Sequence, residues 1–220
     1  MDSTTQFAAE AASTEPSGLP AAAWRFIGRA LEAALAALTL ILVAPALGLI
    51  AVAIKLDSRG PVLYRCKRIG FRGREFEMLK FRKMWRDAAG PPLTSADDDR
   101  FTRLGRVLAA TKLDEFPQLW NVVRGDMSIV GPRPIRPAFF EELCEEIPQY
   151  WQRLVVEPGM TGFAQLRMTR ETSWSEKLAH DLEYIADRSV ALYLRVVAAT
   201  AWRVLTSPFR ALAGLASSRP

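Results

Sequence analysis

The chain has 220 residues, half of them hydrophobic, and a formal net charge of +5. This composition provides a core for one domain and excludes global disorder. Two separate cysteines, Cys66 and Cys144, do not make a disulfide framework, and a single histidine, His180, argues against a zinc site of the usual kind. The positive charge suits nucleic acid, anionic lipid or phosphorylated substrates, and by itself does not choose among them.

The N-terminal part predicts a tail followed by a membrane helix. Residues 1–20 are rich in Ser, Thr, Ala and Pro without an apolar period, which predicts a disordered tail. The 22 residues from Ala33 to Ile54 carry no charge, and as a straight helix they would extend about 33 Å, enough to cross the hydrocarbon of a bilayer. The basic residues that follow, beginning with Lys55, predict that the C-terminal body lies in the cytoplasm.

Pro45 lies in the middle of this apolar run and predicts a kink, because proline removes a backbone hydrogen bond and its ring presses on the carbonyl four residues earlier. Two shapes follow: a bent single span with the N-terminus outside, or a re-entrant helix with both ends in the cytoplasm. The residues themselves leave both shapes open. A buried helix of a soluble protein is a third and less favoured interpretation.

Residues 61–86 predict a β-hairpin with a basic face. Nine basic and two acidic residues lie between Arg65 and Arg86, and Phe76 and Met78 alternate with charged neighbours. Beside a membrane helix, such a face suits anionic headgroups and phosphates, and a solvated charged surface is the alternative. Nucleic-acid binding is less favoured because no DNA-binding or RNA-binding motif is present.

Residues 87–100 have the composition of a loop. Three successive acids in it, Asp97, Asp98 and Asp99, are similar to the Asp-x-Asp metal motif of many sugar-nucleotide enzymes. A solvated turn or the start of a helix explains them more simply.

Two adjacent acids, Asp114 and Glu115, follow a helix predicted at 101–110. Asp114 as N-cap, with Pro117 in the first turn and Gly125 as C-cap, predicts a second short helix. Capping and the helix dipole explain both acids without catalysis. The alternative is a catalytic site.

The C-terminal half adds one candidate phosphate ligand and one candidate interfacial helix. Arg133 lies between two prolines, so its guanidinium loses little entropy on gripping a phosphate, and a salt bridge in a turn is the alternative. Residues 158–162, PGMTG, predict a tight glycine turn that approaches a site or a strand. Residues 190–209 are apolar but interrupted by two arginines, which predicts an amphipathic helix in the membrane interface. A surface helix packed on the core is the alternative.

Several of these motifs occur together in a recognisable order. After the apolar helix with its central proline come GPVLYRCKRIG, EMLKFRKM, TKLDEFPQLWNVVRGDMSIVGPRP, PGMTGFAQL and then SWSEKL with HDLEYI. From about Arg25 to Leu205 the chain resembles the bacterial sugar transferases, also called monotopic phosphoglycosyl transferases. It is similar to their short form, which has only the catalytic unit.

The resemblance implies transfer of a phosphosugar from a UDP-sugar to polyprenyl phosphate, with release of UMP. It assigns Asp114 as the nucleophile, which forms an acyl-phosphate sugar intermediate that the lipid phosphate then displaces. Glu115 matches the second acid, which assists with metal or with the lipid phosphate, and Mg²⁺ bound by Asp114 and Glu115 is expected. Lys80 and Arg133 match phosphate-binding residues. Pro45 matches the helix-breaking proline, which favours the re-entrant shape.

The chain departs from the family's pattern at three positions. Ala44 replaces the serine that usually precedes the membrane proline, and Cys66 stands where glutamine is common. Ala109 occupies the position of an arginine that many members carry five residues before the nucleophile. Lys112 is the candidate to supply this missing positive charge and to bind phosphate.

The predicted fold is α+β, mainly helical with a small β-hairpin or sheet, one proline-kinked re-entrant membrane helix and interfacial amphipathic helices. The predicted boundaries are a disordered tail at 1–20, the membrane helix at 21–56, a cytoplasmic catalytic domain with the C-terminal interfacial helix at 57–209, and a tail at 210–220.

The predicted partners are a UDP-sugar, polyprenyl phosphate and inner-leaflet lipid, without nucleic acid and with a homo-oligomer left open. The expected location is the cytoplasmic face of the inner membrane, at the first membrane step of exopolysaccharide or glycoconjugate synthesis. Two other classes remain: a metal-dependent glycosyltransferase that uses Asp97 and Asp99, and a non-enzymatic lipid-binding module. The sugar-phosphate transferase releases UMP, the glycosyltransferase releases UDP, and the lipid-binding module releases neither.

Overall fold

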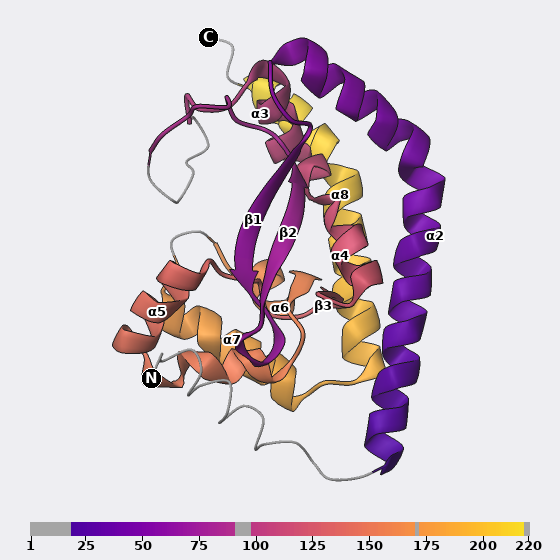
Figure 1. The fold of residues 1–220 in the computed structure, drawn as a ribbon, viewed down its shortest axis with the longest axis vertical. Coiled ribbons are helices and arrows are strands. Elements are labelled where there is room, and N and C mark those ends of the chain that lie inside the picture. Colours follow the sequence, from indigo (N-terminus) through magenta and orange to yellow (C-terminus); the bar gives the residue numbers. More distant parts are fainter. Residues whose placement is uncertain (1–18, 91–97, 170–171, 218–220) are drawn as a thin grey trace.

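The computed structural model describes residues 19–90, 98–169 and 172–217. Most of the predicted N-terminal tail therefore lies outside the described residues. The described part is mainly helical with two small sheets, as predicted (Figure 1). The helices are α2 (Leu19–Asp57), α3 (Arg103–Thr111), α4 (Gln118–Arg124), α5 (Pro137–Glu146), α6 (Phe163–Arg167), α7 (Trp174–Ala186) and α8 (Val190–Ser217). The strands are β1 (Leu63–Ile69), β2 (Glu75–Phe81), β3 (Ser128–Val130) and β4 (Gly159–Thr161), and the 3₁₀ turns are η1 (Phe71–Gly73), η2 (Leu113–Glu115) and η3 (Pro148–Val155).

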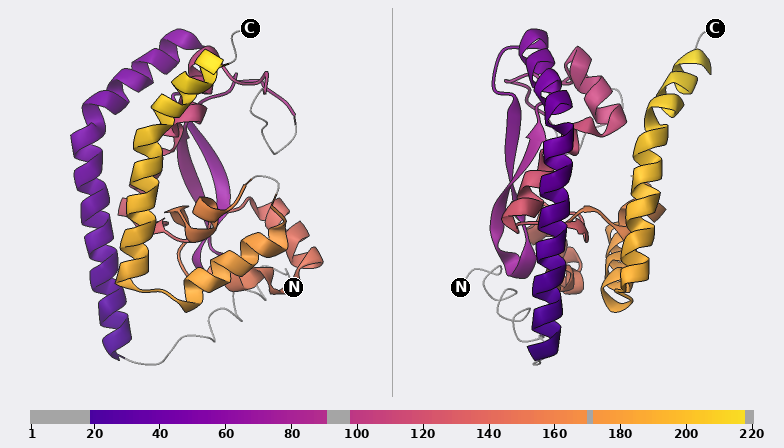
Figure 2. Two further views of the ribbon diagram at one scale, coloured as in Figure 1. Left: turned by 180° about the vertical axis from the view of Figure 1, so that it is seen from behind. Right: turned by 90° about the vertical axis from the view of Figure 1, so that its right-hand side faces the viewer.

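The two long helices, α2 and α8, both run along the long axis of the molecule (Figure 2). The β1–β2 hairpin stands between α2 and the layer formed by α5 and α7 (Figure 1). The second sheet is a short parallel pair, in which Ser128 lies opposite Gly159 and Val130 lies opposite Thr161. α8 extends to Ser217, past the boundary expected at residue 209.

The hairpin is the one predicted from residues 61–86, with Cys66 opposite Met78 and Tyr64 opposite Lys80. Successive side chains of a strand point to opposite faces. In β2 this alternation buries Phe76 and Met78 between exposed glutamates, and the same period carries on to Lys80, which is buried. A lysine therefore lies on the inner face of the hairpin because its position continues an apolar row.

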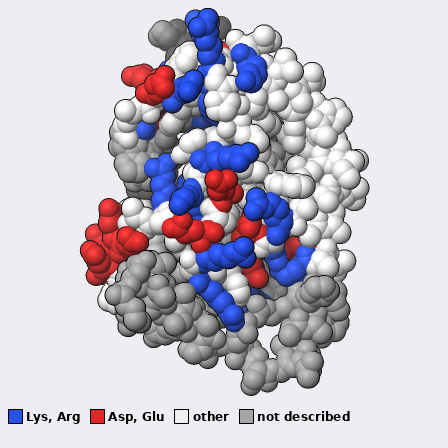
Figure 3. Space-filling model, viewed as in Figure 1, with Lys and Arg blue, Asp and Glu red and all other residues white. Residues whose placement is uncertain are grey.

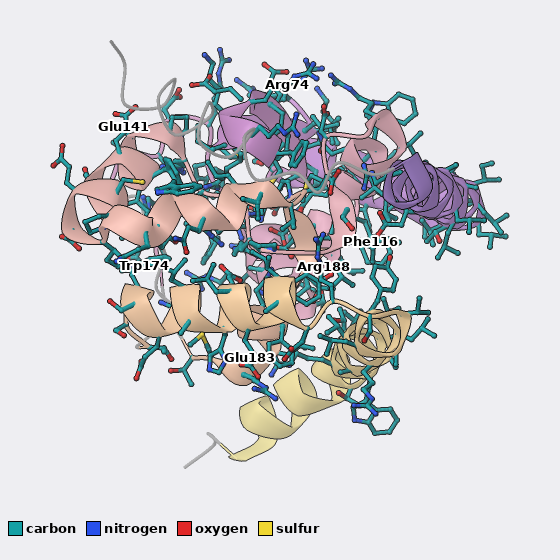
Figure 4. All side chains as sticks on the ribbon, turned by 90° about the horizontal axis from the view of Figure 1, so that it is seen from below. Arg74, Phe116, Glu141, Trp174, Glu183 and Arg188 are labelled. Carbon is teal, nitrogen blue, oxygen red and sulfur yellow. The ribbon has the colours of Figure 1, made fainter. Side chains whose placement is uncertain are left out.

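α2 packs against the body along one side and is exposed along the other. Ala36 is fully buried in a cluster with Met78 of the hairpin and Val122 of α4. The opposite side exposes large apolar side chains, which project away from the body where α2 is seen end on (Figure 4). The exposed residues are Leu31, Leu35, Leu38, Ile41, Leu42, Leu49, Val52 and Leu56.

By length and composition, residues 28–57 of this helix could cross a membrane, and only 6% of their most apolar window is buried. A buried core helix, one of the alternatives, does not fit these exposures. The charged residues gather over the hairpin, while the side formed by α2 shows almost none (Figure 3). Pro45 lies inside α2, and its kink and the re-entrant path stay predictions.

α8 has one packed and one exposed side. Val196 is buried against Val130 and Tyr184, whereas Val190 and Trp202 are exposed. One side of α8 is therefore packed on the core, as the alternative predicted, and the other side exposes apolar side chains. Its position in a membrane interface stays a prediction.

Glu32 joins the N-terminal part of α2 to the body. Its carboxylate accepts hydrogen bonds from Arg29 at 2.8 Å, from the Ser128 hydroxyl at 2.6 Å and from the Tyr193 hydroxyl at 2.6 Å. Arg29 also donates to the carbonyl of Met127 at 2.9 Å. Charge-assisted hydrogen bonds are among the strong ones, so this junction fixes α2 against β3 and α8.

Arg82 fixes the other end of α2. Its guanidinium is buried and donates to three backbone carbonyls just beyond that helix, those of Ser58 at 2.8 Å, Arg59 at 2.7 Å and Pro61 at 2.7 Å. The planar fork of arginine serves three acceptors at once, which a lysine ammonium at the same place could not match in geometry. The end of the helix is thereby held against the residue that follows β2.

We expect Arg82→Lys to lower the free energy of unfolding by about 2 kcal/mol or more, because it leaves buried carbonyls without a donor. Thermal unfolding in detergent micelles measures the effect. The matched control is Arg65→Lys on the exposed side of β1, which should change stability by about 0.5 kcal/mol or less. Equal melting temperatures for the two variants would contradict the structural role of Arg82.

Candidate active site

Charged side chains from three distant segments meet beside the end of β2. Lys80 belongs to β2 and Lys83 follows it, Asp114 and Glu115 belong to η2, and Arg133 comes from the loop after β3. Three ion pairs join them: Lys83 with Asp114, and both Lys80 and Arg133 with Glu115. The structure thus brings together four of the five residues predicted for the site.

The turn that carries the two acids is not the helix start that was predicted. Asp114 as N-cap is wrong: α4 begins at Gln118 with Pro117 as its N-cap, and no side chain caps it. The reason is η2, which is closed by hydrogen bonds from Glu115 N to Lys112 O at 3.1 Å and from Phe116 N to Leu113 O at 3.4 Å. This extra turn separates the acids from α4.

The left-handed backbone of Lys112, with φ of 62°, ends α3 and starts this turn. The predicted C-cap of α4 is confirmed, since Gly125 has φ of 84° and its N–H bonds the last turn of the helix. Because α4 has only seven residues and begins after the acids, a helix dipole does not explain them.

Asp114 is almost completely buried, with 1% of its surface exposed. Lys83 Nζ lies 2.9 Å from Oδ2, but neither carboxylate oxygen accepts an aligned hydrogen bond within the described part of the chain. A buried carboxylate without hydrogen bonds is uncommon and asks for an explanation. Oδ1, which has no partner among the described residues, is therefore available to bond an electrophile or a cation.

Glu115 lies between two cations. Its Oε1 accepts from Lys80 Nζ at 2.7 Å and from Arg133 Nη2 at 3.1 Å. Burial raises the pKa of Glu115, but the charges of Arg133, Lys80 and Lys112 outweigh it and hold the pKa well below its usual range. Burial lowers the pKa of Lys80, against the opposing effect of Glu115. Because of the cations around it, Glu115 is therefore ionised at neutral pH and forms an ion pair with Lys80.

Arg133 is positioned by glycine packing between two loops. Gly131 and Gly159 are so close that a side chain on either would overlap the other's backbone. Gly159 N donates to the carbonyl of Pro132 at 2.9 Å, and Arg133 Nη1 donates to Gln165 Oε1 at 3.1 Å. The predicted glycine turn at 158–162 therefore does approach the site, and in doing so it forms β4.

The other predicted acids and cations lie apart from this cluster. Asp97 is outside the described residues, and Asp98 forms an ion pair with Arg100 at 2.6 Å. Lys112 is exposed and influences Glu115 only through its charge. It forms no ion pair within residues 98–169 or the other described segments.

Two residues of the site were missed in the sequence. Lys83 lies three positions after Lys80, beyond the last residue of β2, so the strand period gives no reason to place it with Asp114. Gln165 follows the glycine turn at 158–162, and that turn was the available signal. Both contacts join segments that are distant in the sequence.

Among the described residues there is no group of three or more metal-binding side chains. Mg²⁺, however, is usually bound by one or two carboxylates together with substrate phosphates. The buried oxygens of Asp114, which accept no aligned hydrogen bond, and the adjacent Glu115 provide two such carboxylates. The donor set therefore fits Mg²⁺ only as an ion shared with a phosphorylated substrate.

Comparison with known proteins gives a consistent family. The profile of the bacterial sugar transferases matches residues 23–207. The chain is 42% identical over 196 residues to the UDP-glucose:undecaprenyl-phosphate glucose-1-phosphate transferase of Caulobacter vibrioides, covering 86% of this chain and 73% of that protein.

Two further relatives differ in the sugar that their names give. The UDP-glucose:undecaprenyl-phosphate glucose-1-phosphate transferase of Escherichia coli K12 is 41% identical, over 81% of this chain and 40% of that protein. The UDP-N-acetylgalactosamine-undecaprenyl-phosphate N-acetylgalactosaminephosphotransferase of Aeromonas hydrophila is 36% identical, over 86% of this chain and 46% of that protein. The chain thus spans less than half the length of these two relatives.

The low pKa of Glu115 predicts a pH-dependent contribution to stability. Because the pKa is depressed in the folded state, the stabilisation is present above the unfolded pKa of about 4.3 and is lost as the pH falls from there toward the folded pKa. We expect Glu115→Gln to be less stable than the wild type at pH 7, and the difference to shrink below about pH 4.3.

Urea unfolding in detergent across this pH range measures the difference, with Glu141→Gln on the exposed side of α5 as the matched control. A difference that stays constant down to about pH 3 would show that folding does not lower the pKa of Glu115.

Proposed function

Because the match over residues 23–207 shows that this chain belongs to the bacterial sugar transferase family, we propose that it transfers a sugar 1-phosphate from a UDP-sugar to a polyprenyl phosphate and releases UMP. Membership of the family also confirms the predicted enzyme class. The relatives are named for UDP-glucose and for UDP-N-acetylgalactosamine, so the proposal is limited to a UDP-sugar.

One observation carries the mechanism: the carboxylate of Asp114 is buried, accepts no aligned hydrogen bond and faces one ammonium. In the first step an oxygen of Asp114 attacks the β-phosphorus of the UDP-sugar. A bond from this oxygen to phosphorus forms, the bond to the bridging oxygen breaks, and its electron pair leaves with UMP. Splitting the transfer into two displacements is the general logic of covalent catalysis.

In the second step the phosphate of the polyprenyl lipid attacks the same phosphorus. The bond from phosphorus to Asp114 breaks, its electron pair returns to the carboxylate, and a polyprenyl diphosphosugar forms. The buried position of Asp114 supports a covalent intermediate between the two steps, because exclusion of water protects an acyl phosphate from hydrolysis.

Glu115 serves in both steps as the anchor of the phosphate-binding cations. Lys80 and Arg133 share its Oε1, so both cations are held in place before a diphosphate arrives. Positioned cations contribute more than mobile ones because they need no reorganisation during the reaction. Lys112 adds positive charge at the rim of the site from its exposed position.

The donor set of Asp114 and Glu115 would hold Mg²⁺ together with the substrate's phosphates. When bound, the ion neutralises charge on the diphosphate, which an anionic nucleophile must approach. Asp114 and Glu115 supply the oxygens for it, and the three cations around them supply the rest of the positive charge.

The attachment of α2 on both sides of its apolar run supports a re-entrant path in the cytoplasmic face of the inner membrane. Glu32, just before the run at 33–54, bonds Ser128 and Tyr193, and Arg82 bonds the carbonyls just after the helix. A helix that crossed the bilayer would place these two attachments on opposite sides, whereas here both bond one charged body. The lipid phosphate and the UDP-sugar then meet on one side of the membrane.

We expect Asp114→Asn to lower the rate of UMP release from UDP-glucose and undecaprenyl phosphate by about 10³-fold or more, because an amide cannot form the covalent intermediate. A radiolabelled sugar should remain on the wild-type protein when the lipid acceptor is left out, and should be absent from the variant. The matched control is Asp187→Asn at the exposed end of α7. Normal turnover by Asp114→Asn, or release of UDP in place of UMP, would refute the mechanism.

Topology is tested by a cysteine placed at Ser3 and, separately, at Glu141 on the exposed side of α5. For a re-entrant helix, neither cysteine should react with a membrane-impermeant maleimide in intact spheroplasts, and both should react after permeabilisation. The natural thiols, Cys66 and Cys144, are buried and give a low background. Labelling of the Ser3 position alone in intact spheroplasts would establish a spanning helix.

A further inference from the structure

We infer that Lys83 is a further catalytic residue: its ammonium group holds Asp114 through Oδ2 and then binds the phosphoryl group that becomes attached to Asp114. The inference rests on the proposed function, because it assigns a role within the same covalent step. Lys83 would then supply the positive charge that Ala109, at the position of the family's arginine, cannot provide.

Asp114 requires a cation close to it. An ionised carboxylate out of water is strongly destabilised unless it is paired, and this side chain is 1% exposed without an aligned hydrogen bond. Within the described part of the chain, Lys83 is the residue that forms an ion pair with Asp114, at 2.9 Å. The charge of the nucleophile is therefore balanced by Lys83.

The other cations of the site are engaged elsewhere. Lys80 and Arg133 both bond Oε1 of Glu115, at 2.7 and 3.1 Å. Lys112 lies two residues before Asp114, but its side chain is exposed and forms no ion pair with the acids among the described residues. The role expected for Lys112 beside the nucleophile thus belongs to Lys83.

Lys83 is fixed in place by the start of α3. Its carbonyl accepts a hydrogen bond from Thr102 N at 3.1 Å, and a side chain at Gly105 would overlap this same carbonyl. Its ammonium lies 5.7 Å from the centre of the Phe101 ring, within the range of a cation–π contact. The cation is therefore positioned before substrate binds, as electrostatic catalysis requires.

Exposure distinguishes the two members of the pair. The Lys83 side chain is 26% exposed, whereas that of Asp114 is 1% exposed. An incoming anionic diphosphate can thus contact the ammonium first, while Asp114 stays shielded from bulk water. Since Lys83 binds Oδ2, the other oxygen, Oδ1, is the one left to attack.

The charge of the ion pair is conserved through the step. As Asp114 Oδ1 bonds to the β-phosphorus and the bond to UMP breaks, the carboxylate loses its negative charge and the new phosphodiester group carries one. UMP leaves with the electron pair of the broken bond, and no proton is transferred. Lys83, beside the ester oxygens, exchanges its carboxylate partner for a phosphoryl oxygen and so stabilises both the start and the end of the displacement.

The test measures the first half-reaction, in which UMP is released in a burst from UDP-glucose without lipid acceptor. We expect Lys83→Met to slow the burst by about 10²-fold, the effect of removing one positioned charge donor. The matched control is Lys67→Met, an exposed lysine of β1 paired with Glu75, which should keep the wild-type rate. A wild-type burst rate in folded Lys83→Met would overturn the inference.

A second variant separates charge from folding. Lys83→Cys is alkylated either with 2-bromoethylamine, which restores an ammonium group, or with iodoacetamide, which adds a neutral group. The other two thiols, Cys66 and Cys144, are buried. We expect recovery of the burst by at least about tenfold with the first reagent and none with the second. Equal rates after complete modification by either reagent would show that the charge is not required.

The outcomes also separate this inference from the proposed function. If wild-type protein turns over a UDP-sugar with the lipid acceptor but gives no burst and no labelled adduct with that same donor, the covalent mechanism itself fails. If wild-type protein gives the adduct and Lys83→Met forms it equally fast, the mechanism stands and only the role of Lys83 is lost.

Discussion

The burial of the Asp114 carboxylate constrains the residues around it. A charge removed from water must be balanced locally, and Lys83 provides that balance at 2.9 Å. The neighbouring acid, Glu115, is balanced by Lys80 and Arg133. Three cations therefore face two carboxylates, and the excess positive charge favours a diphosphate over neutral ligands. The same arrangement that stabilises the buried carboxylate of Asp114, the proposed nucleophile, thus also favours an anionic substrate.

Each of these cations is held by backbone structure and not by the acids alone. The strand period of β2 turns Lys80 inward, and the start of α3 holds the backbone of Lys83. The close glycine packing of the loops around Gly131 and Gly159 sets the position of Arg133. A site assembled in this way keeps its geometry when a substrate replaces the internal ion pairs.

The parts of the site that follow a local rule were predictable from the sequence. Strand alternation predicted the hairpin that carries Lys80, and the two flanking prolines singled out Arg133. The pairing of Lys83 with Asp114 joins segments about thirty residues apart, and no local period encodes such a contact. Lys112 was expected beside the nucleophile because it is close in sequence, but its side chain is exposed and acts on Glu115 only through its charge. Asp114 was misread as a cap because a 3₁₀ turn and a helix start have the same local composition.

The two attachments of α2 connect the membrane to this chemistry. At one end Glu32 bonds Ser128, whose strand leads directly to the loop of Arg133. At the other end Arg82, which lies between Lys80 and Lys83 in sequence, bonds the carbonyls that follow the helix. The apolar stretch between the two attachments is exposed and gains free energy on entering lipid. Since α2 is fixed on both sides of this stretch to segments that carry the cations, the proposed membrane position of α2 would also set the depth of the cations relative to a lipid phosphate.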